Sequence, residues 1–264
     1  MSLLYKDIFE RNIGLLSDSE QEKLKNSSVA VFGIGGLGGV ISEILVRSGV
    51  GHLKIIDKDR FEVSNLNRQN FAFTDTIGQL KVDATDRLLK KINPDLLTEK
   101  YLRVDAGNIT AILNDTSLVF LALDDVIPVL LISRYARKKS IPVVEGWALP
   151  YGNVRVFTGE NQPLEEVYNL DIPDGDVENM TPEVRERLNQ SMLFELKKIK
   201  NIGAYFTEEA LERIKSGRIT SFAPMVWFTA VLMSIEGIKI LLGWGTVPTS
   251  SDFTLYDPFT HTIP

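Results

Sequence analysis

The sequence predicts an α/β fold: a doubly wound sheet with helices on both faces, a helical insertion and a short C-terminal β segment. Three observations predict it. Short apolar, β-rich segments alternate with segments of helical spacing from residue 28 to residue 149, as in a parallel sheet covered on both faces. A glycine-rich turn joins the first strand to the first helix, and charged helix formers replace the alternation over residues 160–218.

The alternating elements follow one another in a regular order. The expected strands cover residues 29–33, 52–57, 96–104, 117–123 and 142–149. The expected helices cover residues 34–49, 78–94, 108–115 and 129–140. Right-handed crossovers make a doubly wound sheet the expected topology, and such sheets bind ligands beyond the carboxyl ends of their strands.

Composition and charge exclude several classes of site. The 264 residues include no cysteine and two histidines. This excludes disulfides, cysteine zinc sites, thioester intermediates and persulfides on this chain, and a histidine metal cage or triad is not expected. The net charge of −6 argues against a general nucleic-acid surface. The N-terminus lacks the apolar stretch of an export signal, and the most apolar run, Phe222–Ile235, has 14 residues, whereas a membrane span needs about 20. We therefore expect a cytoplasmic protein that does not contact a membrane.

Gly33, Gly35 and Gly38 form a G-x-G-x-x-G pattern directly after the first strand, at the start of a helix. Glycine permits the tight turn, and the unpaired N–H groups of a helix N-terminus bind phosphate. Asp57 ends the second strand, 19 residues beyond Gly38, where a carboxylate accepts hydrogen bonds from ribose hydroxyls. The combination predicts a nucleotide site in a Rossmann-like sheet, although a nicotinamide oxidoreductase would contain the same pair.

A second group of polar residues separates these alternatives. Asn65, Arg68 and Lys81 follow Asp57 within 24 residues, and Asp124 ends the fourth strand. A guanidinium, an ammonium and a carboxylate able to hold Mg²⁺ are the groups needed for attack on a triphosphate. A dehydrogenase needs a residue at the hydride site instead, and no cluster of phosphate-neutralising cations. The pattern therefore favours ATP.

Five motifs carry a resemblance to a known family. They are GIGGLG at 33–38, DKD at 57–59, SNLNRQ at 64–69, IGQLK at 77–81 and INP at 92–94. In order and spacing the set resembles the adenylating domain of the ThiF/MoeB/HesA proteins, the bacterial relatives of ubiquitin-activating enzymes. The apolar helix that follows Ser221 and the closing segment TLYDPFT resemble the same family. The resemblance thus covers nearly the whole chain except residues 160–218.

This resemblance implies an ATP-dependent nucleotidyltransferase. In the family, a carboxylate attacks the α-phosphate of ATP and yields an acyl adenylate and pyrophosphate. The carboxylate is usually the C-terminal glycine of a small ubiquitin-like or sulfur-carrier protein, and a peptide is an equivalent substrate. The resemblance implies Mg²⁺ but no zinc, because the two Cys-x-x-Cys pairs of many relatives are missing. The acceptor cysteine is missing too, which implies that the enzyme stops at the adenylate or passes it to an external acceptor.

The resemblance also assigns roles to single residues. Asp57 binds the ribose and the glycine loop forms the platform for adenine and ribose. Asn65, Arg68 and Lys81 contact the phosphates, and Asp124 holds Mg²⁺. The full set of expected cofactor-binding residues is Gly33, Gly35, Gly36, Gly38, Asp57, Asp59, Asn65, Arg68, Gln69 and Lys81. For Arg68 and Lys81, the alternative role is an ion pair with a neighbouring carboxylate.

Arg11 resembles the arginine that the family sends from one subunit into the active site of its partner, which implies a homodimer. The match departs from the family, because Ile8 and Phe9 replace an Arg-Tyr pair and Asn12 replaces a glutamine. A solvated surface arginine is the alternative. The expected catalytic residues are therefore Arg68, Lys81, Asp124 and Arg11.

Three other functions stay open. The Asp-x-Val pattern at Asp124 and the basic stretch 134–139 resemble cyclising dehydratases that act on a carboxyl group of modified tRNA, although the acidic pI and a solvated helical face argue against RNA. A non-catalytic scaffold subunit would have no need of Arg68, Lys81 and Asp124. A nicotinamide oxidoreductase would be stabilised by a different nucleotide.

Four segments make up the expected chain. Residues 1–27 form an amphipathic N-terminal helical segment with Ser17 or Asp18 as N-cap, and residues 28–159 form the nucleotide-binding adenylation domain. Residues 160–218 form a helical insertion, which either covers the active-site crevice or is a solvated helical pair without function. Residues 219–264 form the C-terminal helix and strands that complete the core and the dimer interface.

Overall fold

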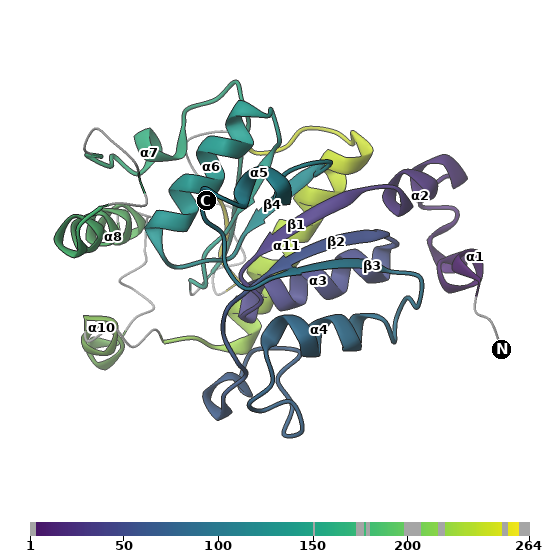
Figure 1. Ribbon diagram of the computed structural model, residues 1–264, viewed down its shortest axis with the longest axis horizontal. Helices are drawn as coiled ribbons and strands as arrows, with labels where there is room; N and C mark the ends of the chain where they lie inside the picture. The colour runs from purple at the N-terminus through teal and green to yellow at the C-terminus, as the bar shows by residue number, and fades with distance from the viewer. Residues whose placement is uncertain are drawn as a thin grey trace.

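One mixed sheet runs through the centre of the computed structural model, which describes residues 4–149, 151–172, 177, 180–197, 207–215, 220–249 and 253–258. The strand order is β3-β2-β1-β4-β5-β6-β7, and helices cover both faces of the sheet (Figure 1). Strands β1 to β5 pair in parallel, whereas β6 and β7 are added antiparallel. The predicted doubly wound α/β fold is confirmed. The strands are β1 (Ser28–Phe32), β2 (His52–Ile56), β3 (Leu97–Tyr101), β4 (Leu118–Leu121), β5 (Val143–Glu145), β6 (Gly152–Phe157) and β7 (Thr254–Tyr256).

The order of the strands reverses at β1, which lies between β2 and β4. The last residues of these three strands, Phe32, Ile56 and Leu121, pair side by side, so their carboxyl ends lie at one edge. Ligands of doubly wound sheets bind at such a reversal. Gly33 and Asp57 directly follow two of the ends, so the fold brings these predicted site residues to that edge.

Alternate residues of β1 face two separate apolar cores. Val29 and Val31 face the core that contains α3, α4 and α11, whereas Ala30 and Phe32 face the core that contains α5, α6 and α7. This alternation is the pleat of a strand buried on both faces. The helices that the structure describes are α1 (Tyr5–Ile8), η1 (Glu10–Asn12), α2 (Asp18–Lys25), α3 (Gly36–Ser48), η2 (Val63–Asn65), α4 (Lys81–Leu89), α5 (Ile109–Ile112), α6 (Val126–Lys138), α7 (Leu164–Val167), α8 (Pro182–Lys197), α10 (Glu208–Lys215) and α11 (Ala223–Leu242).

The sequence does not predict strand β6, which is buried along its whole length. The predicted fifth strand extends to residue 149, but β5 ends at Glu145 and the chain turns back to pair antiparallel with it. Arg155 of β6 faces Glu145 across the pair at 2.7 Å, and both side chains are 3% exposed. The charged Arg155 interrupts the apolar pattern of β6, so the sequence does not read as a buried strand. The ion pair with Glu145 neutralises the buried charge and allows it inside the sheet.

The N-terminal segment is less helical than its spacing predicts. α1 and η1 are single turns, and Gly14 follows them with φ at +105°. The Ser17 hydroxyl accepts the N–H of Glu20 at 3.3 Å, and the Glu20 carboxylate accepts the N–H of Ser17 at 2.8 Å. This capping box confirms Ser17 as the N-cap of α2, and Asp18 is the first helical residue.

Helix α11 confirms the apolar helix predicted from Pro224 to Gly243. It extends beyond the most apolar run through Glu236, which is buried and pairs with Lys239 at 2.8 Å, and Gly243 is its C-cap. Its 20 residues are long and apolar enough to cross a membrane by length and composition alone. Its packing is that of a core helix, because Ala230 and Met233 are fully buried and the helix contacts α3 and β6.

The expected insertion is helical where the structure describes it, as α7, α8 and α10. Figure 1 shows α8 and α10 at the left of the molecule, opposite α1 and α2. Leu188 of α8 is fully buried in the core that contains α6. Residues 173–176, 178, 179, 198–206 and 216–219 lie outside the described residues, and the predicted boundary at 218 falls among them. The boundary at 159 stays a prediction. The expected C-terminal β segment is present as β7, which pairs with β6.

Candidate active site

The glycine turn between β1 and α3 is tight enough to exclude side chains. Gly33 has φ at +90°, and a Cβ there would collide with the main-chain carbonyl of Ala122. A Cβ on Gly38 would collide with the carbonyl of Gly33, and one on Gly36 would lie 2.8 Å from Val226. Helix α3 starts at Gly36, and no side chain caps its N-terminus. The first N–H groups of α3 are therefore available to an anion.

Asp57 joins this turn to the loop after β2. Its Oδ2 accepts the N–H of Ile34 at 2.7 Å, and its Oδ1 accepts the N–H of Asp59 at 2.8 Å. Burial raises the pKa of the Asp57 carboxyl, and the ammonium of Lys81 opposes the rise. Each carboxylate oxygen has two lone pairs, so Asp57 still has acceptor capacity for ribose hydroxyls.

Lys81 begins α4 and extends a buried ammonium between two carboxylates. Its Nζ lies 3.2 Å from Oδ2 of Asp59 and 3.7 Å from Oδ2 of Asp57. The N–H of Lys81 also donates to the carbonyl of Asp59 at 2.9 Å. The predicted alternative, an ion pair with Asp59, is thus present in this structure. It places the ammonium beside the expected ribose ligand, where a phosphate can compete for it.

The loop from 62 to 70 holds Asn65 and Arg68. The Asn65 Oδ1 accepts the N–H of Glu62 at 3.0 Å, so this buried amide orders its own loop. The Arg68 Nη1 donates to the Ser64 carbonyl at 2.9 Å and to Asn67 Oδ1 at 2.8 Å. Arg68 has no ion pair with any residue that the structure describes. Burial lowers the pKa of the Arg68 guanidinium, which still stays charged in proteins.

Arg68 and Gln69 lie against the glycine turn. The Arg68 Cγ is 3.7 Å from the position of a Cβ on Gly36, and the Gln69 Nε2 is 3.7 Å from that position on Gly35. The Gln69 Oε1 is buried and has no hydrogen-bond partner within the described part of the chain. A buried acceptor without a donor is costly, so Gln69 is suited to a ligand that donates a hydrogen bond.

Asp124 follows β4 and is exposed, with no hydrogen bond or ion pair to the described residues. These residues contain no cluster of three metal-binding side chains. Mg²⁺ needs only one or two protein carboxylates when phosphate oxygens and water complete its coordination. The free carboxylate of Asp124 therefore fits an ion that binds mainly to the nucleotide.

The helical insertion contacts the chain directly after Asp124. Asp125 caps α6 by accepting the N–H of Ile127 at 3.1 Å. From α8, the Asn189 Oδ1 accepts the N–H of Val126 at 3.1 Å, and Arg185 Nη1 lies 3.7 Å from Asp125 Oδ2. The insertion therefore lies beside the carboxyl end of β4, as expected for a segment next to the crevice.

Arg11 is the one predicted site residue that the structure leaves apart from this cluster. It is exposed, and the next residue, Asn12, donates to the carbonyl of Ser48 at 3.3 Å. Ser48 ends α3, whose opposite end carries the glycine turn. Because a helix rises 1.5 Å per residue, the 13 residues of α3 separate Arg11 from the turn by about 20 Å.

Three contacts to the site, two from α11 and one from the residues just before it, were not predicted. The Trp227 Nε1 donates to the Arg68 carbonyl at 2.8 Å, and Asn67 Nδ2 donates to the Ser221 carbonyl at 3.2 Å. Val226 packs against Gly36. No local signal in the sequence identifies these contacts, since they join residues more than 150 positions apart.

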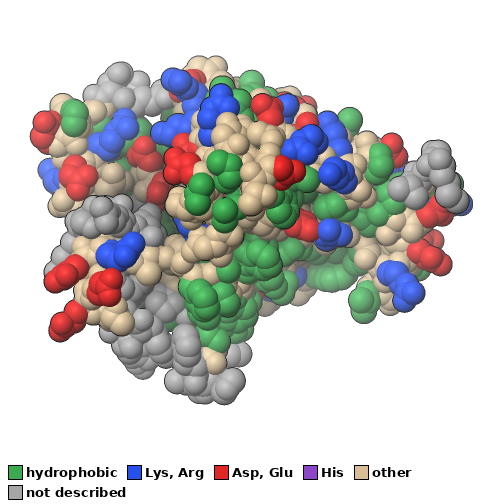
Figure 2. Space-filling model, turned by 90° about the horizontal axis from the view of Figure 1, so that it is seen from below, with side chains coloured by type: hydrophobic (Ala, Val, Ile, Leu, Met, Phe, Trp, Pro, Cys, Tyr) green, Lys and Arg blue, Asp and Glu red, His purple; other side chains and the backbone are tan. Residues whose placement is uncertain are grey.

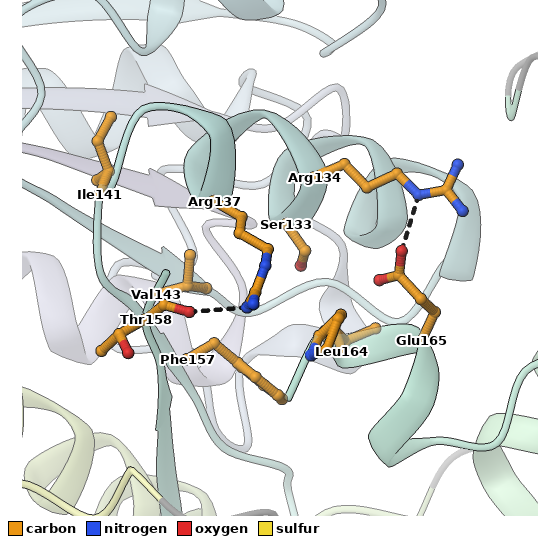
Figure 3. Close-up of a pocket in the computed structure, with 10 residues that line it drawn as sticks. Ser133, Arg134, Arg137, Ile141, Val143, Phe157, Thr158, Leu164 and Glu165 are labelled. Atoms are coloured by element: carbon orange, nitrogen blue, oxygen red, sulfur yellow. Dashed lines mark hydrogen bonds and ion pairs between the residues drawn. The ribbon is translucent and has the colours of Figure 1, made fainter. Parts of the chain in front are cut away.

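Two arginines of the basic stretch 134–139, Arg134 and Arg137, line a separate pocket between α6, β6 and α7 (Figure 3). Arg137 Nη1 donates to the carbonyls of Thr158 at 2.9 Å and Asn161 at 2.6 Å, and Arg134 Nε pairs with Glu165 at 3.0 Å. Both arginines thus stabilise the fold around α7. This leaves the stretch less suited to bind RNA than its charge suggests.

Comparisons with known proteins identify the family to which the chain is similar. The profile of the ThiF family matches residues 9–264. Molybdopterin-synthase adenylyltransferase of Escherichia coli is 29% identical over 242 residues, which cover 91% of this chain and 82% of that protein. Sulfur carrier protein ThiS adenylyltransferase of Bacillus subtilis is 37% identical over 50% of this chain and 40% of its own length.

Two further matches bear on the fold and on the RNA alternative. The crystal structure of PaaA superimposes with a TM-score of 0.67 at 25% identity and covers 94% of this chain and 77% of that one. The tRNA threonylcarbamoyladenosine dehydratase of Bacillus subtilis is 45% identical over 87 residues, which are 33% of this chain and 34% of that protein.

Proposed function

Because the chain belongs to the ThiF family of ATP-dependent nucleotidyltransferases, we propose that it adenylates the C-terminal carboxylate of a small ubiquitin-like or sulfur-carrier protein or peptide. One observation carries the proposal most directly. Arg68 lies against the glycine turn with no carboxylate partner in the described chain. A half-buried guanidinium without a counter-charge is suited to bind an anion.

The proposed reaction transfers AMP to the carboxylate. A carboxylate oxygen of the substrate attacks the α-phosphorus of ATP, the bond from that phosphorus to the bridging oxygen breaks, and pyrophosphate leaves. The substrate carboxyl, with a pKa of about 3.5, is already ionised, so no general base is required. The protein must bring two anions together and neutralise the charge that builds on the phosphate oxygens.

The residues at the carboxyl edge divide this work. Asp57 accepts hydrogen bonds from the ribose, and the N-terminus of α3 approaches the nucleotide without a side chain between them. Arg68 and Lys81 neutralise the phosphates, and Gln69 accepts a hydrogen bond from the nucleotide. Mg²⁺ would be held by Asp124 and would neutralise further phosphate charge.

We propose a homodimer as the active form, in which Arg11 of one chain serves the site of the other. Arg11 lies about 20 Å from the glycine turn of its own chain along α3. An exposed apolar stripe on α11, formed by Trp227, Val231 and Ile235, supports this proposal. Figure 2 shows hydrophobic side chains gathered on the face of the molecule where α11 runs. Burial of this stripe by a second copy removes apolar area from water.

Pyrophosphate exchange tests the proposed activity. Labelled pyrophosphate should enter ATP when a carrier protein ending in glycine is present, and the Arg68→Ala variant should lose this exchange. The control is Arg47→Ala, since Arg47 pairs with Glu43 on the surface of α3 at 2.7 Å. Unchanged exchange in the Arg68 variant would contradict the proposed site, and stabilisation by NAD but not ATP would contradict the proposed nucleotide.

The tRNA-directed activity is the second candidate. The local match to a tRNA dehydratase favours it, whereas the internal contacts of Arg134 and Arg137 disfavour it. Titration with total tRNA at physiological salt distinguishes the two candidate functions, because only the tRNA-directed activity requires the protein to bind tRNA.

A further inference from the structure

Trp227 lies on the exposed stripe of α11, but its indole N–H forms a hydrogen bond with a residue of the candidate active site. The side chain is 45% exposed, and its indole N–H donates to the main-chain carbonyl of Arg68 at 2.8 Å. An indole has one donor and no acceptor. Trp227 therefore directs its only hydrogen bond to the residue that carries the proposed phosphate-binding guanidinium.

The loop around Arg68 depends on such contacts for its position. Its own main-chain hydrogen bonds are local, because the N–H groups of Arg68 and Gln69 both donate to the carbonyl of Asn65 at 3.1 and 2.9 Å. Among the described residues, the guanidinium forms hydrogen bonds only with Ser64 and Asn67 of the same loop. Neither of these two sets of hydrogen bonds connects Arg68 to the glycine turn.

Asn70 connects the end of the loop to α3. Its Nδ2 donates to the carbonyl of Gly39 at 3.3 Å and to Glu43 Oε2 at 2.7 Å. These bonds hold the loop beyond Arg68 but do not contact Arg68 itself.

Helix α11 supplies a second connection, at Arg68 itself, because it contacts both parts of the site. Val226 is 2% exposed and packs against Gly36, where α3 begins. One residue further, Trp227 holds the Arg68 carbonyl, and Ser221 before the helix accepts from Asn67 at 3.2 Å. The same rigid helix thus touches the N-terminus that approaches the nucleotide and the loop that carries the cation.

We infer that Trp227 is a positioning residue: its N–H fixes the main chain of Arg68 so that the guanidinium faces the phosphates of ATP. The inference rests on the proposed function of Arg68. Small displacements of a charged group weaken its interaction with a phosphate strongly. Loss of the indole donor therefore acts on the phosphate part of the ligand and leaves the adenine and ribose part unchanged.

The test compares the affinities of ATP with Mg²⁺ and of adenosine, measured by calorimetry on the full chain. Trp227→Phe keeps an aromatic ring and removes the donor. Loss of a single hydrogen bond corresponds to about a 2- to 10-fold change in affinity. We therefore expect the affinity for ATP to fall by that factor and the affinity for adenosine to stay the same. In the Arg68→Ala background the Trp227→Phe effect should vanish, because the group that it positions is gone.

Two matched controls separate this role from structural ones. Trp244→Phe removes another half-buried indole, whose N–H donates to Glu20 at 2.6 Å, away from the site. Ile235→Ala changes the same exposed stripe, so it measures any effect that a change in the proposed dimer interface has on ATP binding. Trp244→Phe should not change the ratio of ATP to adenosine affinity, and Ile235→Ala should change it less than Trp227→Phe does.

Each result has a distinct meaning. If Arg68→Ala leaves the ATP affinity unchanged, the proposed role of Arg68 fails and the inference fails with it. If Arg68→Ala weakens ATP but Trp227→Phe does not, only the inference is overturned. The inference is also overturned if Trp227→Phe weakens adenosine binding as much as ATP binding. The same holds if the Trp227→Phe effect persists in the Arg68→Ala background, or if Ile235→Ala weakens ATP binding by the same factor.

Discussion

Replacement of Lys81 by methionine leaves a buried carboxylate without its cation. The Lys81 ammonium lies 3.7 Å from Asp57, and both side chains are 8% exposed. Removal of one partner of a fully buried pair costs about 3–5 kcal/mol. Asp57 keeps two main-chain hydrogen bonds, and Asp59 is exposed enough to be solvated. We therefore expect the free energy of unfolding to fall by about 1–3 kcal/mol at neutral pH.

The loss should depend on pH with a definite sign. Burial raises the pKa of Asp57 in the folded protein, and removal of the Lys81 ammonium raises it further. The folded protein then binds the proton more tightly than the unfolded chain does. The penalty of the buried charge is therefore full above the folded pKa, shrinks as the pH falls, and is absent below the unfolded value of about 3.9.

Urea unfolding followed by tryptophan fluorescence at pH 7.5 and pH 5 measures this difference. The control is Lys25→Met, because Lys25 pairs with Glu22 at 3.7 Å and both side chains are exposed, so that the substitution should cost no more than about 0.5 kcal/mol at either pH. A Lys81→Met variant as stable as the native chain at pH 7.5, or equally destabilised at both pH values, would refute the reasoning.

Three further predictions concern the same site. Asp124→Asn should abolish Mg²⁺-dependent pyrophosphate exchange while the melting temperature stays within about 1 °C, because the carboxylate has no partner among the described residues; a large drop in melting temperature would show a structural role instead. Gly33→Ala should destabilise the chain by more than about 1 kcal/mol, because φ is +90° and the new methyl group meets the Ala122 carbonyl; thermal unfolding measures it, and a neutral result would disprove the tight turn. Inactive Arg11→Ala and Arg68→Ala chains, when mixed and allowed to exchange subunits, should recover about one quarter of native exchange activity, because half of the random dimers are hybrids with one complete site each; no recovery would argue against a shared site.

Several features follow directly from local sequence. Gly33 must adopt a positive φ in the turn after β1, and Gly38 must leave room for the Gly33 carbonyl, so the motif alone predicts the turn. Ser17 and Glu20 form a capping box through groups three residues apart. Short-range sterics and hydrogen bonds make such features readable from neighbouring residues.

Other features depend on residues that are distant in sequence. Strand β6 cannot be predicted from its own residues because it contains the charged Arg155. Only the tertiary structure shows that Glu145 lies 2.7 Å from Arg155 and neutralises its charge. The 13-residue length of α3 places Arg11 at the far end of that helix from the glycine turn, although the motif alone suggests that it belongs to the site.

The motifs of the chain are thus sufficient to predict the glycine turn and the strand ends at which the candidate site lies, because each depends on backbone geometry within a few residues, and the alternation of strands and helices predicts the doubly wound sheet. They do not reveal that Trp227 holds the Arg68 carbonyl or that Asn189 caps the N–H of Val126. Those contacts arise when whole helices pack against the sheet, and the packing of buried apolar faces, rather than any local pattern, selects which polar atoms meet.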